Sequence, residues 1–194
     1  MVLNAFFSVI KNHNFDEYYK YRFYEYGWNV DYANGTTQEI TYDFNNAGPS
    51  LGNYYRLDET LEEIQNIVDL CKQNKIELTV FVNPMYYVTY EASLSVNYYD
   101  FLIGLANITE YYNFSGYNEI TIDSANWIDN SHFSAEVSDM MKEVFCYNHY
   151  YSLLYDEGFG VKVTKDNISN LISILEECRN NYLENGVPYR TGWE

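Results

Sequence analysis

The chain lacks the features that mark a disulfide-rich, zinc-binding or membrane-spanning protein. Its three cysteines, Cys71, Cys146 and Cys178, are far apart and form no Cys-x-x-Cys or Cys/His ligand spacing, so neither a disulfide framework nor a structural zinc site is expected. Cys71 and Cys178 fall on apolar helix faces and are predicted to be small buried hydrophobic residues. No run approaches the ~18 apolar residues that cross a bilayer. The apolar start, MVLNAFFSVIKNHNF, has no basic segment and no small-residue cleavage site, so we expect no membrane insertion by this chain.

Positive charge is also scarce. The chain has 11 Lys and Arg against 28 Asp and Glu, which gives a formal net charge of −17. The acidic residues are spread along the chain, and their field repels phosphate backbones and anionic membrane surfaces. No nucleic acid is therefore expected as a partner. His13 and His149 stand in no ligand spacing with His132, and no calcium-loop or phosphate-loop motif is present, so we predict no metal and no cofactor.

Apolar residues, by contrast, are abundant. They make up 47% of 194 residues, enough for one packed domain over residues 1–194. Tyrosine occurs 23 times, and its flat apolar ring with a hydroxyl group suits stacking on sugar rings. An AT-rich genome would also enrich Tyr together with Asn and Ile, so this composition has two explanations. Six Tyr-Tyr doublets begin at Tyr18, Tyr54, Tyr86, Tyr98, Tyr111 and Tyr150.

The first part of the chain, residues 1–57, is irregular, with one strand predicted at about 38–44. From Asp58 the pattern is more regular. Apolar positions at helical spacing predict a helix that Asp58 caps and Asn74 ends. The run IELTVFV at 76–82 is nearly unbroken and β-branched, as in a buried parallel strand.

Further along, periodicity predicts a helix at about 98–112 and a short strand at 119–122. Ser134 can cap an amphipathic helix that carries Val137, Met141 and Val144 on one face, and a last helix is expected at about 167–182. Helices that alternate with short apolar strands indicate an α/β fold.

One short motif carries recognisable chemistry. In WIDNSHFS, at 127–134, Asp129 stands three residues before His132. One turn can bring the two side chains together, so that the carboxylate accepts from Nδ1 and leaves Nε2 facing outward as a base. The motif lies between a predicted strand and a strong helix, where α/β proteins place their working groups. An isolated Asp-x-x-His can also arise by accident in an acid-rich chain.

The order of several segments resembles the C-terminal part of SGNH (GDSL-type) hydrolase-like proteins, in the bacterial branch of surface-polysaccharide O-acyltransferases and esterases. The segments are CKQNKIELTVFVNPMYY, FSGYNEI, WIDNSHFSAEVSDMM and FGVKVTKDNI, and the resemblance covers residues 58–183. It implies a three-layer, flavodoxin-like parallel sheet, here incomplete on its N-terminal side. It also implies His132 as general base and Asp129 as its orienter, acting on a carbohydrate or another acylated small molecule. Intact family members are often extracytoplasmic and membrane-anchored.

The nucleophile of that family is not found. It lies in a Gly-Asp-Ser or Gly-Thr-Ser turn after the first strand, and no serine here follows either dipeptide. Ser124 follows Asp123 and so resembles the motif without its glycine, but it lies eight residues before His132. Ser131 and Ser115 are weaker candidates for the nucleophile. Gly116-Tyr117-Asn118-Glu119 loosely echoes the family's oxyanion block but sits too close to Asp129 for its roles to be carried over. The chain is then either the C-terminal portion of a longer protein or a divergent member without catalysis.

Two other functions remain open. The chain could be a noncatalytic carbohydrate-binding module, which predicts exposed tyrosine doublets lining one groove. It could also be an interaction fragment whose exposed apolar surface is covered in a homo-oligomer.

Overall fold

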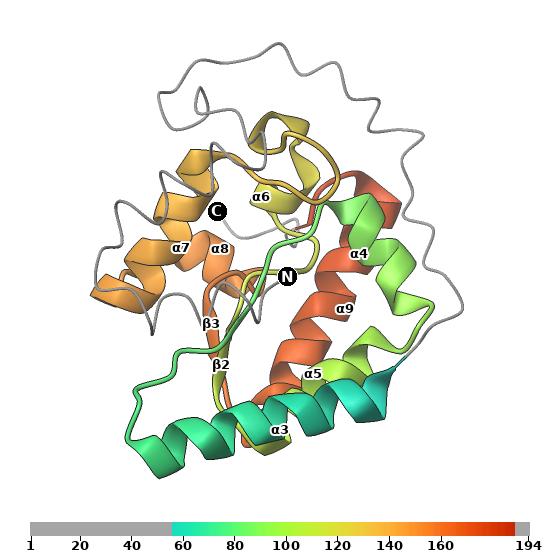
Figure 1. The fold of residues 1–194 in the computed structure, drawn as a ribbon. Helices are drawn as coiled ribbons and strands as arrows, with labels where there is room; N and C mark the ends of the chain where they lie inside the picture. The colour runs from blue at the N-terminus through green and yellow to red at the C-terminus, as the bar shows by residue number, and fades with distance from the viewer. Residues whose placement is uncertain (1–55, 189–194) are drawn as a thin grey trace. The chain divides into compact units, whose positions relative to one another are not determined.

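The computed structural model describes residues 56–188, which Figure 1 shows as a coloured ribbon. The strand predicted at 38–44 lies outside the described residues, and the single domain over 1–194 stays a prediction. The helices are α3 (Leu57–Asn74), α4 (Tyr87–Leu94), α5 (Tyr98–Ile108), α6 (Glu119–Ile122), the 3₁₀ turn η2 (Ser124–Asn126), α7 (Ala135–Tyr147), α8 (Ser152–Asp156) and α9 (Ile168–Asn185). The strands are β1 (Phe81–Val82), β2 (Tyr111–Asn113) and β3 (Val161–Val163).

The described strands form one small mixed sheet in the order β1-β2-β3. β1 and β2 are parallel, with Val82 opposite Asn113. β3 is antiparallel to β2, with Val161 opposite Asn113, so the prediction of a parallel sheet is wrong for this strand. The reason is that β3 begins beside the end of β2, where the Gly160 N–H donates to the Asn113 carbonyl at 2.6 Å. The chain can therefore only run back along β2.

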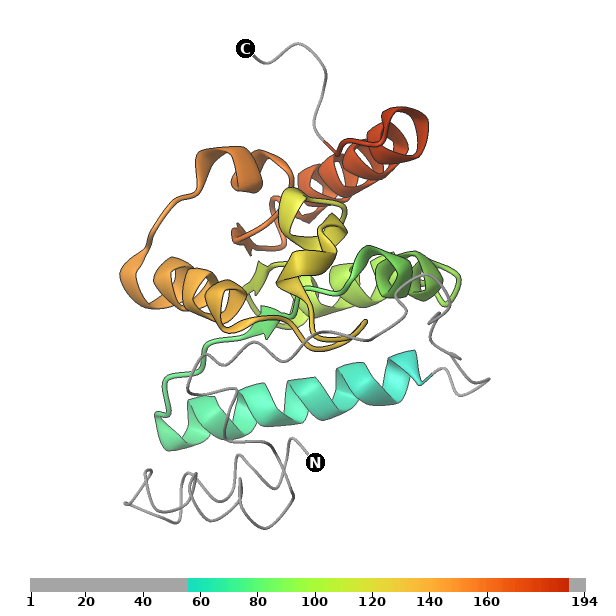
Figure 2. The same cartoon turned by 90° about the horizontal axis from the view of Figure 1, so that it is seen from above.

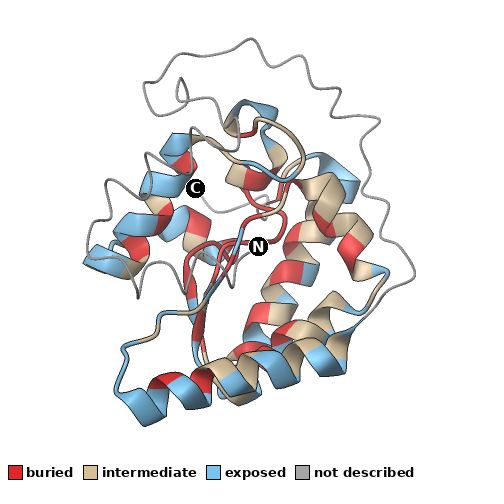
Figure 3. Ribbon diagram, in the orientation of Figure 1, coloured by how far each residue is buried: buried red, intermediate tan, exposed pale blue. Residues whose placement is uncertain are grey.

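Helices cover both sides of this sheet, and the alternation of strand side chains explains why. Tyr111 packs in a core with residues of α5 and α9, such as Leu105 and Leu175. The next residue, Tyr112, packs on the other side with residues of α7, such as Met141. Figure 3 shows the buried residues along the strands and on the inward faces of the helices. The α/β character predicted from the sequence is thus confirmed.

The first described helix, α3, lies along α5, as Figures 1 and 2 show from two directions. It ends at Asn74 as predicted, where Lys75 takes a left-handed conformation. Asp58 does not cap it, because the helix begins at Leu57 and Asp58 stands in its first turn, where its charge favours the helix dipole. Cys71 of α3 and Cys178 of α9 are both buried, as expected, and Cys146 is exposed.

The segment 76–82 pairs in parallel as predicted, but it is not a fully buried strand. Only Phe81 and Val82 are in strand conformation, and Ile76 and Phe81 are 41% and 42% exposed. β1 stands at the edge of the described sheet. An edge strand is covered on fewer sides, so its apolar run is only half buried.

Two predicted elements are corrected. The helix predicted to reach residue 112 ends at Ile108, and Tyr111 begins β2 instead. The strand predicted at 119–122 is the helix α6, because the Asn118 side chain accepts from the N–H groups of Ile120 and Thr121, at 3.1 and 3.0 Å. This capping box outweighs the β-branched residues that suggested a strand.

The two C-terminal helices are confirmed. Ser134 caps α7 by accepting from the Val137 N–H at 3.5 Å, and α9 begins one residue after the predicted start and ends three after the predicted end. The helices α4 and α8 and the strand β3 were not predicted. Between residues 56 and 188, no helix combines the length and the apolar character that a membrane crossing requires.

Candidate active site

Asp129 and His132 are in contact. Asp129 Oδ2 lies 2.7 Å from His132 Nδ1. Asp129 Oδ1 accepts from the backbone N–H groups of Ser131 and His132, at 2.7 and 2.9 Å. The carboxylate therefore uses one oxygen to close the turn and the other to hold the imidazole. The His132 side chain is 63% exposed, and no hydrogen bond to its Nε2 occurs within residues 56–188.

The environment keeps Asp129 ionised. Partial burial raises the pKa of this carboxyl, but the N–H of Ser131 and the hydrogen bond and charge of His132 outweigh burial, and the pKa is lowered from its ordinary value of 3.8. A charged carboxylate beside Nδ1 favours the imidazole tautomer that carries its proton there. That tautomer leaves Nε2 as a proton acceptor.

The loop around the pair is anchored at both ends. Trp127 is fully buried, and its Nε1 donates to the Ile120 carbonyl at 3.2 Å. Trp127 also forms an isolated antiparallel β-bridge with Phe133, and the Ile128 N–H donates to the His132 carbonyl at 2.8 Å. The loop is therefore a small closed hairpin, and its tip holds Asp129 and His132 in place.

The hairpin lies at the end of the sheet where β1 and β2 both terminate. The Thr89 hydroxyl of α4, which follows β1, donates to the Asn130 carbonyl at 2.9 Å. The Tyr86 ring stands edge-on to Trp127, with centroids 5.7 Å apart. The carboxyl ends of parallel strands are the usual place for binding and catalytic groups in α/β proteins. Figure 1 shows the loop between α6 and α7 at this end.

None of the candidate serines contacts His132. Ser124 stands on the exposed 3₁₀ turn η2, and within residues 56–188 its hydroxyl makes no hydrogen bond with His132. The Ser131 hydroxyl donates to Asn130 Oδ1 at 3.2 Å. Ser115 is fully buried and shares hydrogen bonds with Tyr98 and Asn113. A nucleophilic role for Ser124 stays a prediction.

The turn after β2 contains a buried network of hydrogen bonds. Asn113 Nδ2 donates to the carbonyls of Ser115 and Gly158, both at 2.8 Å. Gly116 adopts φ +127°, and a Cβ there would lie 2.5 Å from a methyl group of Leu175. Asn118 Nδ2 is buried without a partner in the described part of the chain. Because this amide is shut off from solvent, the turn does not present it to a substrate.

Sequence reasoning did not find Glu157, a buried carboxyl that is linked to the hairpin through α6. It is 3% exposed and accepts from the Glu119 N–H at 2.9 Å, which ties α8 to the start of α6. Burial, with the nearby charges of Glu119 and Asp156, raises its pKa from 4.5 to about 7, against the lowering effect of that hydrogen bond. The carbonyl of Ile120 in α6 in turn holds Trp127, so Glu157 supports the hairpin indirectly.

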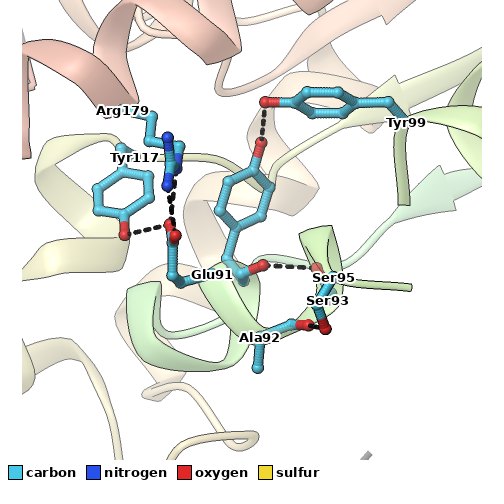
Figure 4. Close-up of polar contacts among 8 residues, drawn as sticks. Glu91, Ala92, Ser93, Ser95, Tyr99, Tyr117 and Arg179 are labelled. Carbon is cyan, nitrogen blue, oxygen red and sulfur yellow. Dashed lines mark hydrogen bonds and ion pairs between the residues drawn. The ribbon is translucent and has the colours of Figure 1, made fainter. Parts of the chain in front are cut away.

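A second polar cluster ties α4 to α9. Arg179 forms a two-point ion pair with Glu91, at 2.7 Å from Nε and 2.5 Å from Nη2, and the Tyr117 hydroxyl donates to the same carboxylate at 2.9 Å (Figure 4). The Arg179 and Tyr117 bonds lower the pKa of Glu91 despite partial burial. Glu91 and Arg179 are 88 residues apart, so no local pattern could have paired them.

The tyrosine doublets at Tyr18 and Tyr54 lie outside the described residues, and the four doublets within residues 56–188 do not line one common groove. Tyr86 and Tyr111 are buried, at 5% and 1% exposure, and the single tyrosines Tyr90 and Tyr117 are buried as well. Their rings pack against one another and against apolar helix faces. Tyr98 and Tyr99 are different, because they line a cavity.

No group of acidic, histidine or cysteine side chains between residues 56 and 188 is arranged to hold a metal ion. Comparisons of the chain with protein-family models, with curated proteins and with solved structures gave no match.

Proposed function

We propose that this chain carries the acid–base pair of an SGNH-type ester hydrolase or O-acyltransferase that acts on a carbohydrate ester. In this proposal His132 is the general base and Asp129 orients it. The observation that carries it is the contact of 2.7 Å between Asp129 Oδ2 and His132 Nδ1, with Nε2 left toward solvent. The segments quoted above, which resemble that family in order, support the same reading and a flavodoxin-like, three-layer parent fold.

The chemistry of such a site is acyl transfer. The base accepts the proton of a serine hydroxyl at Nε2 as the oxygen attacks the ester carbonyl, and it returns the proton to the leaving alcohol. The acyl group stays on the serine until water or an acceptor hydroxyl removes it. Because no serine within residues 56–188 contacts His132, we propose that the nucleophile comes from a segment outside them. No serine of the 194 residues follows Gly-Asp or Gly-Thr, the dipeptides that precede the nucleophile in that family, so we expect little turnover from this chain alone.

Hydrolysis of p-nitrophenyl acetate by the full chain tests the base. We expect slow hydrolysis, since an oriented neutral imidazole can activate water. The part of the rate that depends on His132 should vanish in His132→Gln. It should fall about tenfold in Asp129→Asn, because the asparagine amide no longer favours the His132 tautomer with its proton on Nδ1. The matched control is His149→Gln, since His149 is exposed and contacts the ring of Tyr151. This control should keep the Asp129-dependent part of the rate.

The same assay locates the nucleophile. Ser124→Ala should hydrolyse the ester at the unaltered rate. Hydrolysis that is lost in both His132→Gln and Ser124→Ala would identify Ser124 as the nucleophile and contradict our placement of the nucleophile outside residues 56–188. Equal rates for the unaltered chain and His132→Gln would overturn the role of His132.

The DNA upstream of Met1 gives an independent test. An in-frame apolar strand followed by Gly-Asp-Ser or Gly-Thr-Ser would provide the missing serine. If the upstream DNA encodes no such serine motif and the chain does not hydrolyse p-nitrophenyl acetate, the results would favour a divergent protein that keeps the fold for binding.

A further inference from the structure

A cavity of about 510 Å³ opens at the far end of α4 from the hairpin. Its walls come from Leu94 at the end of α4, from the first turn of α5 and from one side of α9. Thr89, which holds the hairpin, is in the first turn of α4. The eight residues of α4 span ~12 Å, so this cavity is separate from Asp129 and His132. Its volume falls within the ~300–1,000 Å³ of small-molecule sites.

Tyr99 gives the cavity an anchored aromatic wall. Its hydroxyl accepts a hydrogen bond from the buried Tyr90 hydroxyl at 3.3 Å, so the ring is fixed from inside the protein. The ring is half-buried and lines the cavity. A fixed ring in a cavity wall loses little conformational entropy when a flat apolar surface stacks on it.

The polar groups around this ring both donate and accept hydrogen bonds. Asp100 and Glu176 supply carboxylate acceptors, and the Asn180 amide supplies both kinds of group. Glu91 binds Nε and Nη2 of Arg179 and so holds the guanidinium group in one orientation (Figure 4). The N–H groups that are not bound to Glu91 therefore have fixed directions. Burial of Arg179 is partial, with 29% of its side chain exposed.

The charges narrow the class of ligand. Two carboxylates and the net charge of −17 disfavour a phosphorylated or otherwise anionic ligand. Glu91 neutralises the Arg179 charge, but an ammonium group only donates hydrogen bonds, so it would leave the N–H groups of Arg179 and Asn180 without an acceptor. A neutral ligand with many hydroxyl groups and one apolar face satisfies both conditions, because each hydroxyl can donate to Asp100 or Glu176 and accept from Arg179 or Asn180.

We propose that the cavity lined by Tyr99, Asp100, Glu176, Arg179 and Asn180 is a binding site for a neutral saccharide unit. The sugar ring stacks on Tyr99, and its hydroxyl groups bond to the surrounding carboxylates, guanidinium and amide. The site does not depend on Asp129 or His132, so it stands whether or not the proposed acyl chemistry is correct.

Amide NMR spectra of the full chain test this site. The probes are the methyl glycosides of glucose, galactose and N-acetylglucosamine, with spermidine and inorganic phosphate for comparison. We expect saturable shifts in the millimolar range with at least one glycoside, confined to residues 97–100 and 176–180. Tyr99→Ala should weaken this binding about tenfold, through loss of the stacking surface. Asn180→Ala, at an exposed position, should weaken it without disturbing the fold.

The controls separate this site from the rest of the molecule. Tyr147→Ala, at a tyrosine that is 69% exposed on α7, should bind as the unaltered chain does, and His132→Gln should do the same. The proposal is overturned if no glycoside gives saturable shifts, or if Tyr99→Ala and Asn180→Ala both bind with unchanged affinity. Tighter binding of spermidine or phosphate than of every glycoside would also overturn it.

Discussion

Two carboxyl groups near the hairpin have pKa values that move in opposite directions. At Asp129, N–H donors and the imidazole outweigh burial and lower the pKa. At Glu157, burial outweighs a single N–H donor and raises the pKa to about 7. The difference lies in burial, which is deeper at Glu157, and in the larger number of donors that Asp129 receives. Asp129 is thus suited to hold a proton on its histidine, whereas Glu157 makes the structure sensitive to pH.

Replacement of Glu157 by Gln should change how stability depends on pH. The pKa of Glu157 is higher in the folded state, about 7, than its ordinary 4.5. Its contribution to stability is therefore fully present below pH 4.5 and is lost as pH rises through 7. Relative to the unaltered chain, Glu157→Gln should gain roughly 3 kcal/mol of unfolding free energy between about pH 4 and pH 8. Urea unfolding at both pH values measures this gain.

The matched control is Glu184→Gln, at an exposed position on α9. Its stability relative to the unaltered chain should be the same at both pH values. If Glu157→Gln behaves like this control, Glu157 is not a buried carboxyl with a raised pKa.

Among the elements, helices were predicted better than strands. The helical spacing of Val137, Met141 and Val144 is local, so α7 could be located from the sequence. β2 is only three residues long, and its pairing with β1 and β3 decides its conformation. Tyr111 and Tyr112 therefore looked like the end of α5. The same limit applies to the site: the Asp129–His132 contact is local and predictable, whereas the Thr89 and Glu157 contacts join distant segments.

The turn after β2 offers a test of close packing between elements. Gly116→Ala would force a side chain onto φ +127° and place its Cβ 2.5 Å from the Leu175 methyl group. We expect a loss of about 3 kcal/mol in unfolding free energy, from backbone strain and overpacking together. Gly186→Ala is the control, since it has φ +75° but no atom within 4 Å of its added Cβ. It should cost about 1 kcal/mol, from strain alone. Equal losses in urea unfolding would show that Leu175 does not confine Gly116.

At the scale of the whole molecule, charge is the dominant feature. A net charge of −17 on 194 residues makes the compact state repel itself at neutral pH. The same charge discourages anionic partners, whereas neutral carbohydrate ligands are unaffected. We therefore expect the two proposed sites, at opposite ends of α4, to prefer uncharged ligands.

Salt should accordingly stabilise the chain. Raising NaCl from about 0.02 M to about 0.5 M shortens the range of charge repulsion to a few ångströms, and the melting temperature at pH 7 should rise. Calorimetry measures the change. Near the isoelectric point of 4.3 the same addition of salt should have little effect. A melting temperature that falls with salt at pH 7 would mean that ion pairs such as Glu91–Arg179 matter more than net repulsion.

The central claim is that Asp129 orients His132 as a base, and ¹⁵N NMR of the His132 ring at about pH 8 tests it most directly. We predict a proton on Nδ1 and none on Nε2, with this preference lost in Asp129→Asn. It should be retained in Ser131→Ala, because the Ser131 hydroxyl bonds only to Asn130 among the described residues. A proton on Nε2 in the unaltered chain, or identical ring spectra for the unaltered chain and Asp129→Asn, would contradict the account.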